Sequence, residues 1–480
     1  MLKGVVPRCA SVLAVGCALP SAADAATAAE SAPHLDGALL GLAWATPFAG
    51  ILLSVALFPL AAPAFWHHHF GKVAAAWALA FLVPFALTFG LGLALYELLH
   101  TLLLEYLPFV ILLLALFTVA GGIHVGGNLH GSPALNTGFL LLGTLLASWV
   151  GTTGAAMVLI RPLIRANDAR RHNAHVMVFF IFLVANIGGA LTPLGDPPLF
   201  LGFLKGVDFF WPTVHLLAPT GLVSTLLLAA FYLLDRHYYR LERGLPPIPD
   251  RTPDRPLAIE GKVNLPLLAA VLGAVLLSGV WDPGVGVTLY HVTVELQNLA
   301  RDLLLLGIAY LSWTLTGAEV RGRNHFTWAP IVEVAKLFAG IFVTIIPAIA
   351  ILRAGAAGVA APVVRLVSGP GGEPVEAMYF WLTGGLSSFL DNAPTYLVFF
   401  NLAGGDAATL MGPLAPTLAA ISAGAVFMGA NTYIGNAPNF MVYAIARERG
   451  VNMPSFFGYM IWSGAVLVPT FLIVGYVFFA

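Results

Sequence analysis

Eight apolar stretches, each long enough to cross a lipid bilayer, are the feature of this sequence that most limits its fold. They cover residues 37–62, 72–96, 102–125, 211–234, 264–281, 302–317, 327–352 and 455–479. A spanning helix needs roughly 20 mainly apolar residues. Only 9% of the 480 residues are charged, whereas roughly a quarter are charged in a typical soluble domain. Because a soluble globule of this length cannot bury so much apolar surface, the sequence predicts an all-α polytopic membrane protein.

Four further apolar segments are interrupted near their middles by residues that break or cap helices. The interruptions contain Ser, Gly, Thr, Asp, Asn or Pro, and they fall within residues 135–165, 175–206, 375–402 and 416–446. Backbone that leaves the helix at membrane depth must be satisfied by surrounding protein or by a water-filled cavity. We therefore expect these four segments to meet around the functional site.

The two halves of the chain repeat the same motifs. Residues Gly189–Phe200 align with Gly429–Phe440 at an offset of 429 − 189 = 240, and Ser148–Thr153 aligns with Ser388–Ala393 at the same offset. The distribution of basic residues over the loops predicts that the first hairpin enters the membrane from the cytoplasm and the second from outside. The sequence thus predicts two inverted repeats, each with three scaffold helices, a re-entrant hairpin, a discontinuous helix and a final helix.

Basic residues also set the predicted topology and localisation. Lys and Arg gather at 165–171, 236–262 and 321–323, which the positive-inside rule assigns to the cytoplasm. The mature N-terminus is then outside the bacterial cytoplasmic (inner) membrane. The predicted divisions are a signal peptide at 1–25, scaffold helices at 37–125, transport elements at 134–234, a cytoplasmic linker at 235–262, scaffold helices at 263–353 and transport elements at 374–480.

The first 25 residues have the features of a secretory signal peptide. Basic residues precede a short apolar run, and Ala23-Asp24-Ala25 offers small residues suited to cleavage. An uncleaved first membrane helix is the alternative, although the apolar run is short for spanning. Both cysteines, Cys9 and Cys17, lie in this segment, so cleavage leaves a mature chain without thiols.

Two aspartates at predicted helix breaks are the strongest functional candidates. Asp196 stands in Gly-Asp-Pro-Pro and Asp391 in Leu-Asp-Asn-Ala-Pro. A carboxylate inside the membrane is costly and marks a functional site by default. Sodium prefers oxygen ligands, and a buried carboxylate can hold a proton when sodium is absent, so the two ions can exchange. The alternative, that each Asp caps the half-helix after it, is compatible with ion binding.

Neutral oxygens near the same breaks complete the predicted cation site. The residues expected to supply them are Asn392, Asn436, Thr192, Asn431, Thr432, Ser148, Thr152, Thr153, Ser387, Ser388 and Thr395. Singly, each hydroxyl is more often a helix-packing hydrogen bond than a ligand. The predicted cargo is Na+ and H+, no cofactor is expected, and Asp196 and Asp391 are the residues expected to hold the sodium.

Other polar residues have ordinary explanations. Glu105 and Glu333 are expected near the ends of spanning helices, where charges pair or reach water. The triple histidine His67-His68-His69 is expected in a short interfacial loop, as part of an aromatic and polar belt. No phosphate loop, nucleophile elbow or zinc-ligand spacing appears in the sequence, which disfavours an enzyme. The formal net charge of −1 disfavours nucleic acid as a partner and leaves membrane lipid and small ions.

The broken segments resemble the ion transporter superfamily. Asn186–Pro198 and Ser387–Pro394 are similar to the NhaD-type sodium/proton antiporters and to the related citrate and arsenite carriers. The resemblance covers essentially the whole mature chain and implies a homodimer in which hairpins and broken helices move as an elevator-like transport domain. It also implies a cation site that includes Asp196, Asp391 and Asn392. The first hairpin departs from the pattern, because Gly151-Thr152 stands where relatives often have Asp-Asn.

The leading hypothesis is therefore a sodium/proton antiporter. The main alternative is a sodium- or proton-coupled symporter of citrate or another organic anion, because the related carriers share much of the pattern. A channel or a membrane receptor belongs to a different class. The paired breaks argue against a receptor, and the lack of continuous polar helix faces argues against a simple pore.

Overall fold

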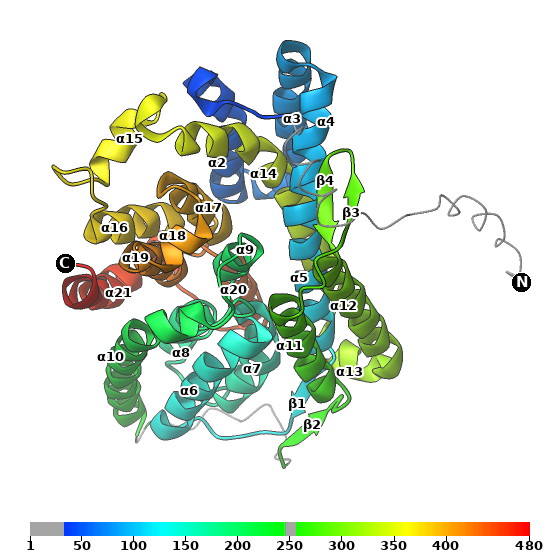
Figure 1. Cartoon of the computed structure of the whole chain (residues 1–480). Coiled ribbons are helices and arrows are strands. Elements are labelled where there is room, and N and C mark those ends of the chain that lie inside the picture. Colours follow the sequence, from blue (N-terminus) through cyan, green and yellow to red (C-terminus); the bar gives the residue numbers. More distant parts are fainter. Residues whose placement is uncertain (1–32, 244, 246–255) are drawn as a thin grey trace, which may run out of the picture.

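A computed structural model describes residues 33–243, 245 and 256–480. The predicted signal peptide and part of the predicted linker lie outside the described residues. Most of the described chain is helical (Figure 1), as the sequence predicted. Within these ranges, seven helical runs are long and apolar enough to cross a membrane.

The first scaffold region forms three long helical runs. Its elements are η1 (Gly37–Leu39), η2 (Leu42–Ala45), α2 (Thr46–Ala61), α3 (Pro63–Phe89), α4 (Leu91–Thr101), η3 (Leu102–Tyr106) and α5 (Leu107–Ala120). The last three elements are continuous, so the third run begins well before the predicted start at residue 102. Two predictions about polar residues are corrected by these bounds. The triple histidine lies in the first turns of α3, not in a loop, and Glu105 lies inside a run, in the π-helical turn η3.

The first transport region contains a hairpin and a broken helix. Its elements are β1 (His124–Gly126), α6 (Pro133–Val150), α7 (Thr152–Ala166), α8 (Ala174–Leu183), η4 (Ile187–Gly189), α9 (Pro197–Leu204) and α10 (Trp211–Glu242). The chain reverses between α6 and α7 at Gly151, whose φ of 80° suits glycine and strains other residues. Between α8 and α9 only the short 3-10 turn η4 is regular, so the α-helix is interrupted where the sequence predicted a break.

The second half also contains scaffold helices, a hairpin, a broken helix and a long final helix, with additional short elements between them. Its scaffold consists of β2 (Ala258–Glu260), α11 (Asn264–Val280), β3 (Gly286–Leu289), β4 (Val292–Glu295), α12 (Leu296–Leu315), α13 (Ala318–Arg323), α14 (Ala329–Arg353), η5 (Gly355–Ala357) and α15 (Ala361–Leu366). The transport elements are α16 (Glu376–Ser387), α17 (Asn392–Leu402), α18 (Ala407–Met411), α19 (Ala415–Met428), η6 (Gly429–Asn431), α20 (Ala437–Glu448) and α21 (Phe456–Phe478). The strands pair as two small antiparallel sheets in loops, β1 with β2 and β3 with β4.

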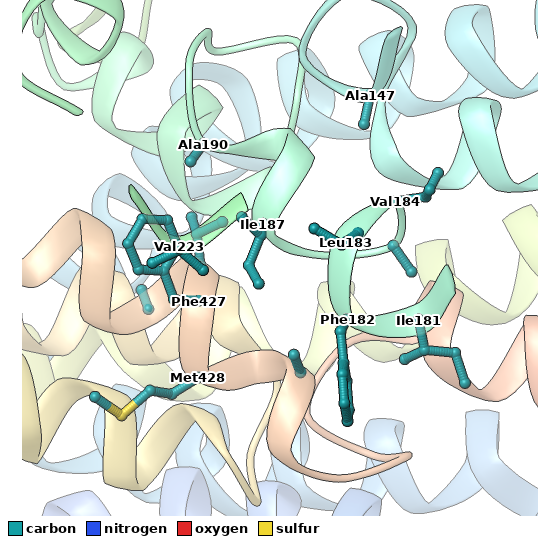
Figure 2. Packing of buried hydrophobic residues seen from close by; sticks show 14 of the residues in the cluster. Ala147, Ile181, Phe182, Leu183, Val184, Ile187, Ala190, Val223, Phe427 and Met428 are labelled. Atoms are coloured by element: carbon teal, nitrogen blue, oxygen red, sulfur yellow. The ribbon is translucent and has the colours of Figure 1, made fainter. Parts of the chain in front are cut away.

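The apolar core is divided between the two kinds of region. One large cluster of buried residues joins α6–α10 to α16–α21, so the transport elements of both halves share a core. Figure 2 shows part of it, where Ile187 of η4 lies near Phe427, close to the end of α19. A second cluster joins the scaffold helices α2, α3, α5, α11, α12 and α14, and it includes Phe200 of α9 and Leu397 of α17.

The two hairpins lie toward opposite ends of the molecule. In Figure 1 the hairpin α6–α7 lies toward the end that holds β1 and β2, whereas α16–α17 lies toward the end that holds α15. Helix α7 also contacts β1 directly. The two hairpins therefore approach the middle of the fold from opposite directions.

A buried charged network holds the first transport region together. The carboxylate of Asp235 on α10 is fully buried and lies 2.5 Å from Nη1 of Arg170 and 2.8 Å from Nε2 of His175. Nδ2 of Asn136 on α6 donates to its second oxygen at 2.9 Å. Because a buried charge must be paired to be tolerated, this carboxylate fixes α6, α8 and α10 relative to one another.

Candidate functional site

The two breaks have the same local structure in both halves. Oγ1 of Thr192 donates to the carbonyl oxygen of Ser148, and Oγ1 of Thr432 donates to that of Ser388 at 2.5 Å. These pairs are separated by the 240-residue offset found in the sequence. Each threonine hydroxyl also accepts from the backbone N–H two residues later. In each half the break is therefore tied to one arm of the neighbouring hairpin.

Asp196 lies where the broken elements of both halves meet. Its side chain is buried, at 1% exposure. It accepts hydrogen bonds from Oγ1 of Thr152 at 3.0 Å and from Nδ2 of Asn436 at 3.1 Å, and also from Nδ2 of Asn392. Although Asp196 precedes α9, its side chain does not cap that helix. The carboxylate is thus directed at α7, α17 and α20, which contradicts the capping alternative for this residue.

Asp391 differs from Asp196 in its local role. Its side chain accepts from the backbone N–H of Ala393 at 3.1 Å and so caps α17. It is only partly buried. Its neighbour Asn392 provides the direct hydrogen bond to Asp196. The structure therefore brings the two acidic motifs together. Asp196 accepts the hydrogen bonds that converge from other elements, whereas Asp391 caps the adjacent helix α17.

A mainly apolar cavity reaches Asp196 from the scaffold side. Its walls come from α5, the tip of the α6–α7 hairpin, the break before α9, and parts of α14 and α20. Residues that line it include Phe109, Leu116, Thr152, Thr153, Asp196, Phe200, Ile331 and Met441. Among the described residues that line this cavity, Asp196 is the one charged side chain. A small cation that enters it meets a carboxylate and uncharged oxygens.

A comparison with known protein families identifies the class of this protein. A family described as "Putative citrate transport" matches residues 37–479. The chain belongs to this citrate transport family. Membership confirms the predicted class, an integral membrane transporter and not an enzyme.

Two mycobacterial proteins are also similar to this family member. Each is named an uncharacterized transporter, one from Mycobacterium bovis and one from Mycobacterium tuberculosis. Both are 25% identical over 327 residues, which cover 67% of this chain and 71% of the relative. Their names support transport and specify no cargo.

Most of the predicted hydroxyl ligands of this family member bond to the backbone and not to Asp196. Oγ of Ser148 donates to the carbonyl oxygen of Gly188, and Oγ of Ser387 donates to that of Ala425. Ser388, Thr395, Thr192 and Thr432 likewise donate to carbonyl oxygens. Nδ2 of Asn431 donates to Oγ of Ser388 at 2.9 Å. These residues shape the breaks, whereas Thr152, Asn392 and Asn436 contact the carboxylate and Thr153 lines the cavity.

Two asparagines that the sequence analysis did not select connect the breaks. Nδ2 of Asn186, which follows α8, donates to Oδ1 of Asn439 on α20 at 2.7 Å. Asn439 in turn donates to the carbonyl oxygens of Gly429 and Thr432. Asn186 also accepts from Asn436 at 3.2 Å. A buried asparagine in an otherwise apolar helix is the signal that could have identified both residues.

Close approach of backbone at each break requires glycine, and this gives a first prediction. A Cβ on Gly195 would lie 2.2 Å from the carbonyl oxygen of Gly189, and the equivalent pair Gly435 and Gly429 is almost as close at 2.5 Å. We expect Gly195→Ala to lower the stability of the detergent-purified protein by about 1–3 kcal/mol, because backbone cannot move aside as a side chain can. Thermal unfolding measures the loss.

Gly385→Ala is the matched control for this prediction. A Cβ at Gly385 on α16 has nothing within 4 Å, so this variant should unfold at the wild-type temperature or slightly above it. Equal midpoints for Gly195→Ala and Gly385→Ala would contradict the packing described for the break.

Proposed function

We propose that this transporter is a sodium/proton antiporter with its cation site centred on Asp196. One observation carries the proposal: a carboxylate is the charged side chain of the central cavity, and donors from both halves converge on it. A carboxylate in an apolar membrane environment attracts a small cation and holds a proton when that cation is absent. Competition between the two ions for one group couples their movements.

The neighbouring amide and hydroxyl groups adapt to either ion in this proposal. Oδ1 of Asn392 is buried and has no hydrogen-bond partner, so it is available as a neutral sodium ligand beside Asp196. Thr152 and Asn436 rotate their oxygens toward the sodium when it binds and return their hydrogens to the carboxylate when it leaves. The charge of Asp391 opposes a second negative charge nearby, so a cation or a proton stabilises the pair.

We further propose that the two halves are inverted repeats and that the transport elements move together. The equivalent hydrogen bonds at the two breaks and the opposite approach of the two hairpins support this arrangement. The shared core of α6–α10 and α16–α21 favours movement as one body against the scaffold. Inverted repeats exchange access to a central site by such rigid-body movement.

The proposal places the protein in the bacterial inner membrane with its mature N-terminus outside. Arg165, Arg170 and Arg323 then lie on the cytoplasmic side, at the end of the molecule that holds β1 and β2. We propose a homodimer formed through the scaffold, following the resemblance to the superfamily. Cross-linking of the purified protein in lipid vesicles tests the dimer without reference to transport.

Cation-coupled symport of citrate or another organic anion is the second candidate. The family description favours it. The central cavity favours the antiporter, because the described residues that line it include no Lys, Arg or His to pair with a carboxylate cargo.

Transport by the purified protein in proteoliposomes distinguishes the two candidates. An internal pH dye reports proton movement after a pulse of external sodium, and labelled citrate reports anion uptake. Sodium-driven proton movement that citrate does not affect supports the antiporter. Citrate accumulation driven by sodium or by a proton gradient, without sodium/proton exchange in the absence of citrate, refutes it and supports the symporter.

Neutralising Asp391 gives a second prediction. We expect Asp391→Asn to reduce sodium-driven proton movement at least about tenfold, because one charge that acts on the cation site is lost. Asn can still cap α17, so the variant should reach the membrane and elute as folded protein. Unchanged sodium-driven proton movement would remove Asp391 from the mechanism.

A further inference from the structure

Arg161 on α7 is a buried cation, two of whose nitrogens have no hydrogen-bond partner among the described residues. Its side chain is 7% exposed, and neither Nε nor Nη1 has a hydrogen-bond partner. Buried guanidinium groups are normally paired with a carboxylate or bonded to carbonyl oxygens. Arg321, another buried arginine, follows this rule with its two Nη atoms, which donate to the carbonyl oxygens of Thr118 and Ser312, and leaves only its Nε without a partner among the described residues. Arg161 is therefore charged, enclosed and unsatisfied.

The charged neighbours of Arg161 add to its positive charge. Arg165 lies one turn later on α7, and Arg449 and the acidic Glu448 lie at the end of α20, which packs against α7. No ion pair joins Glu448 to Arg161 in the described structure. Three cations, with the carboxylates of Glu448 and Asp168 nearby, leave a net positive charge where α7 packs on α20.

The fold itself does not require an arginine at this position. The equivalent residue in the second half, at the 240-residue offset, is Asn401 on α17. Asn401 is neutral and satisfied, because its Oδ1 accepts from Nε of Arg353 at 2.8 Å and its Nδ2 donates to the carbonyl oxygen of Leu397. The equivalent position in the second hairpin is thus occupied by a neutral residue whose amide oxygen and amide nitrogen both form hydrogen bonds.

The position of Arg161 separates it from the cation site. Arg161 is nine residues after Thr152 on the same helix, which is about 14 Å along the axis at 1.5 Å per residue. The displacement is toward the end of α7 that contacts β1, where Nη2 of Arg165 donates to the carbonyl oxygen of Val125. Arg161 does not line the cavity that reaches Asp196.

We propose that Arg161, together with Arg165 and Arg449, forms a binding site for an oxyanion between α7 and α20. Unused guanidinium donors match the acceptors of a carboxylate or phosphate group, and charge-assisted hydrogen bonds to it are strong in a site shielded from water. The oxyanion comes either from a soluble carboxylate or phosphate or from the headgroup of an anionic phospholipid. The site does not depend on the proposed cation exchange.

Binding to the full-length protein in detergent tests the proposal without any transport assay. Sodium citrate and sodium phosphate are titrated against the protein by calorimetry, with sodium chloride at equal ionic strength as the reference. Native mass spectrometry measures retention of phosphatidylglycerol relative to phosphatidylcholine. We expect one of these two kinds of oxyanion to bind, and Arg161→Met to weaken that binding about 10- to 100-fold.

Two further variants make the outcome decisive. Arg449→Gln changes an exposed residue of the site and should weaken binding several-fold. Arg365→Gln removes an exposed charge on α15, near the opposite end of the molecule, and should change nothing. If Arg161→Met and Arg449→Gln lose binding of citrate or phosphate, the ligand of the site is a soluble oxyanion. If these variants lose only the retention of phosphatidylglycerol, the ligand is a lipid headgroup. No binding of either kind by the wild type, or equal binding by the wild type and Arg449→Gln, overturns the proposal whether or not Arg161→Met folds.

Discussion

Asp196→Asn should abolish sodium-driven proton movement in proteoliposomes and weaken sodium binding at least about 100-fold. The substitution removes the one charge that faces the central cavity and leaves three donors directed at a neutral amide. Loss of one partner from a buried charged contact costs about 3–5 kcal/mol, which is a factor of roughly 100 to 4,000 in a binding constant. Calorimetric titration with sodium measures the affinity, and the internal pH dye measures transport.

Asp406→Asn is the matched control for this variant. Asp406 is an exposed aspartate that caps α18 by accepting from the backbone N–H of Thr409, and asparagine caps a helix equally well. We expect wild-type sodium affinity and transport from it. Sodium affinity in Asp196→Asn within twofold of that of Asp406→Asn would show that the cation binds elsewhere.

Asp235→Asn should cause the largest loss of stability among these substitutions. The carboxylate of Asp235 neutralises Arg170 in a fully buried setting and contacts His175 and Asn136. Removing its charge leaves the Arg170 guanidinium without its close partner, and breaking a buried pair in this way costs about 3–5 kcal/mol. Thermal unfolding of the detergent-purified protein should show a markedly lower midpoint.

Glu242→Gln provides the comparison for Asp235→Asn. Glu242 lies 3.5 Å from the same arginine, but its side chain is more exposed at 14%. A more distant and better hydrated pair contributes less, so we expect a small shift in the unfolding midpoint. A larger shift for Glu242→Gln than for Asp235→Asn would contradict the assignment of Asp235 as the main partner of Arg170.

The sequence was sufficient to locate the breaks and the residues nearest to the carboxylate. Asp196 was identified because charges are rare in apolar segments, and Asn392 and Asn436 were identified because the motif repeats at a fixed offset. Helix limits were less accurate, as shown by the early start of the third run at Leu91. Apolar periodicity does not detect a π-helical turn such as η3, so Glu105 was placed at a helix end.

What the sequence could not provide is which side chains meet in space. Asp196 and Asp391 have similar motifs, yet one is enclosed by three elements and the other caps its own helix. Asn186 pairs with Asn439, which is distant in the chain, so local pattern alone does not connect them. The same reason applies to Glu105, which forms a buried ion pair with Lys205 at the end of α9.

That ion pair has a consequence for the speed of the carrier. Glu105 belongs to the scaffold, and Lys205 belongs to the elements that we propose to move. If the pair separates during the cycle, the attraction between the two charges is lost and rehydration offsets only part of that cost, so the movement meets a free-energy barrier. If the pair persists, the end of α9 is a pivot around which the remaining elements turn. In either case this contact, although remote from Asp196, limits how the proposed moving elements can shift against the scaffold.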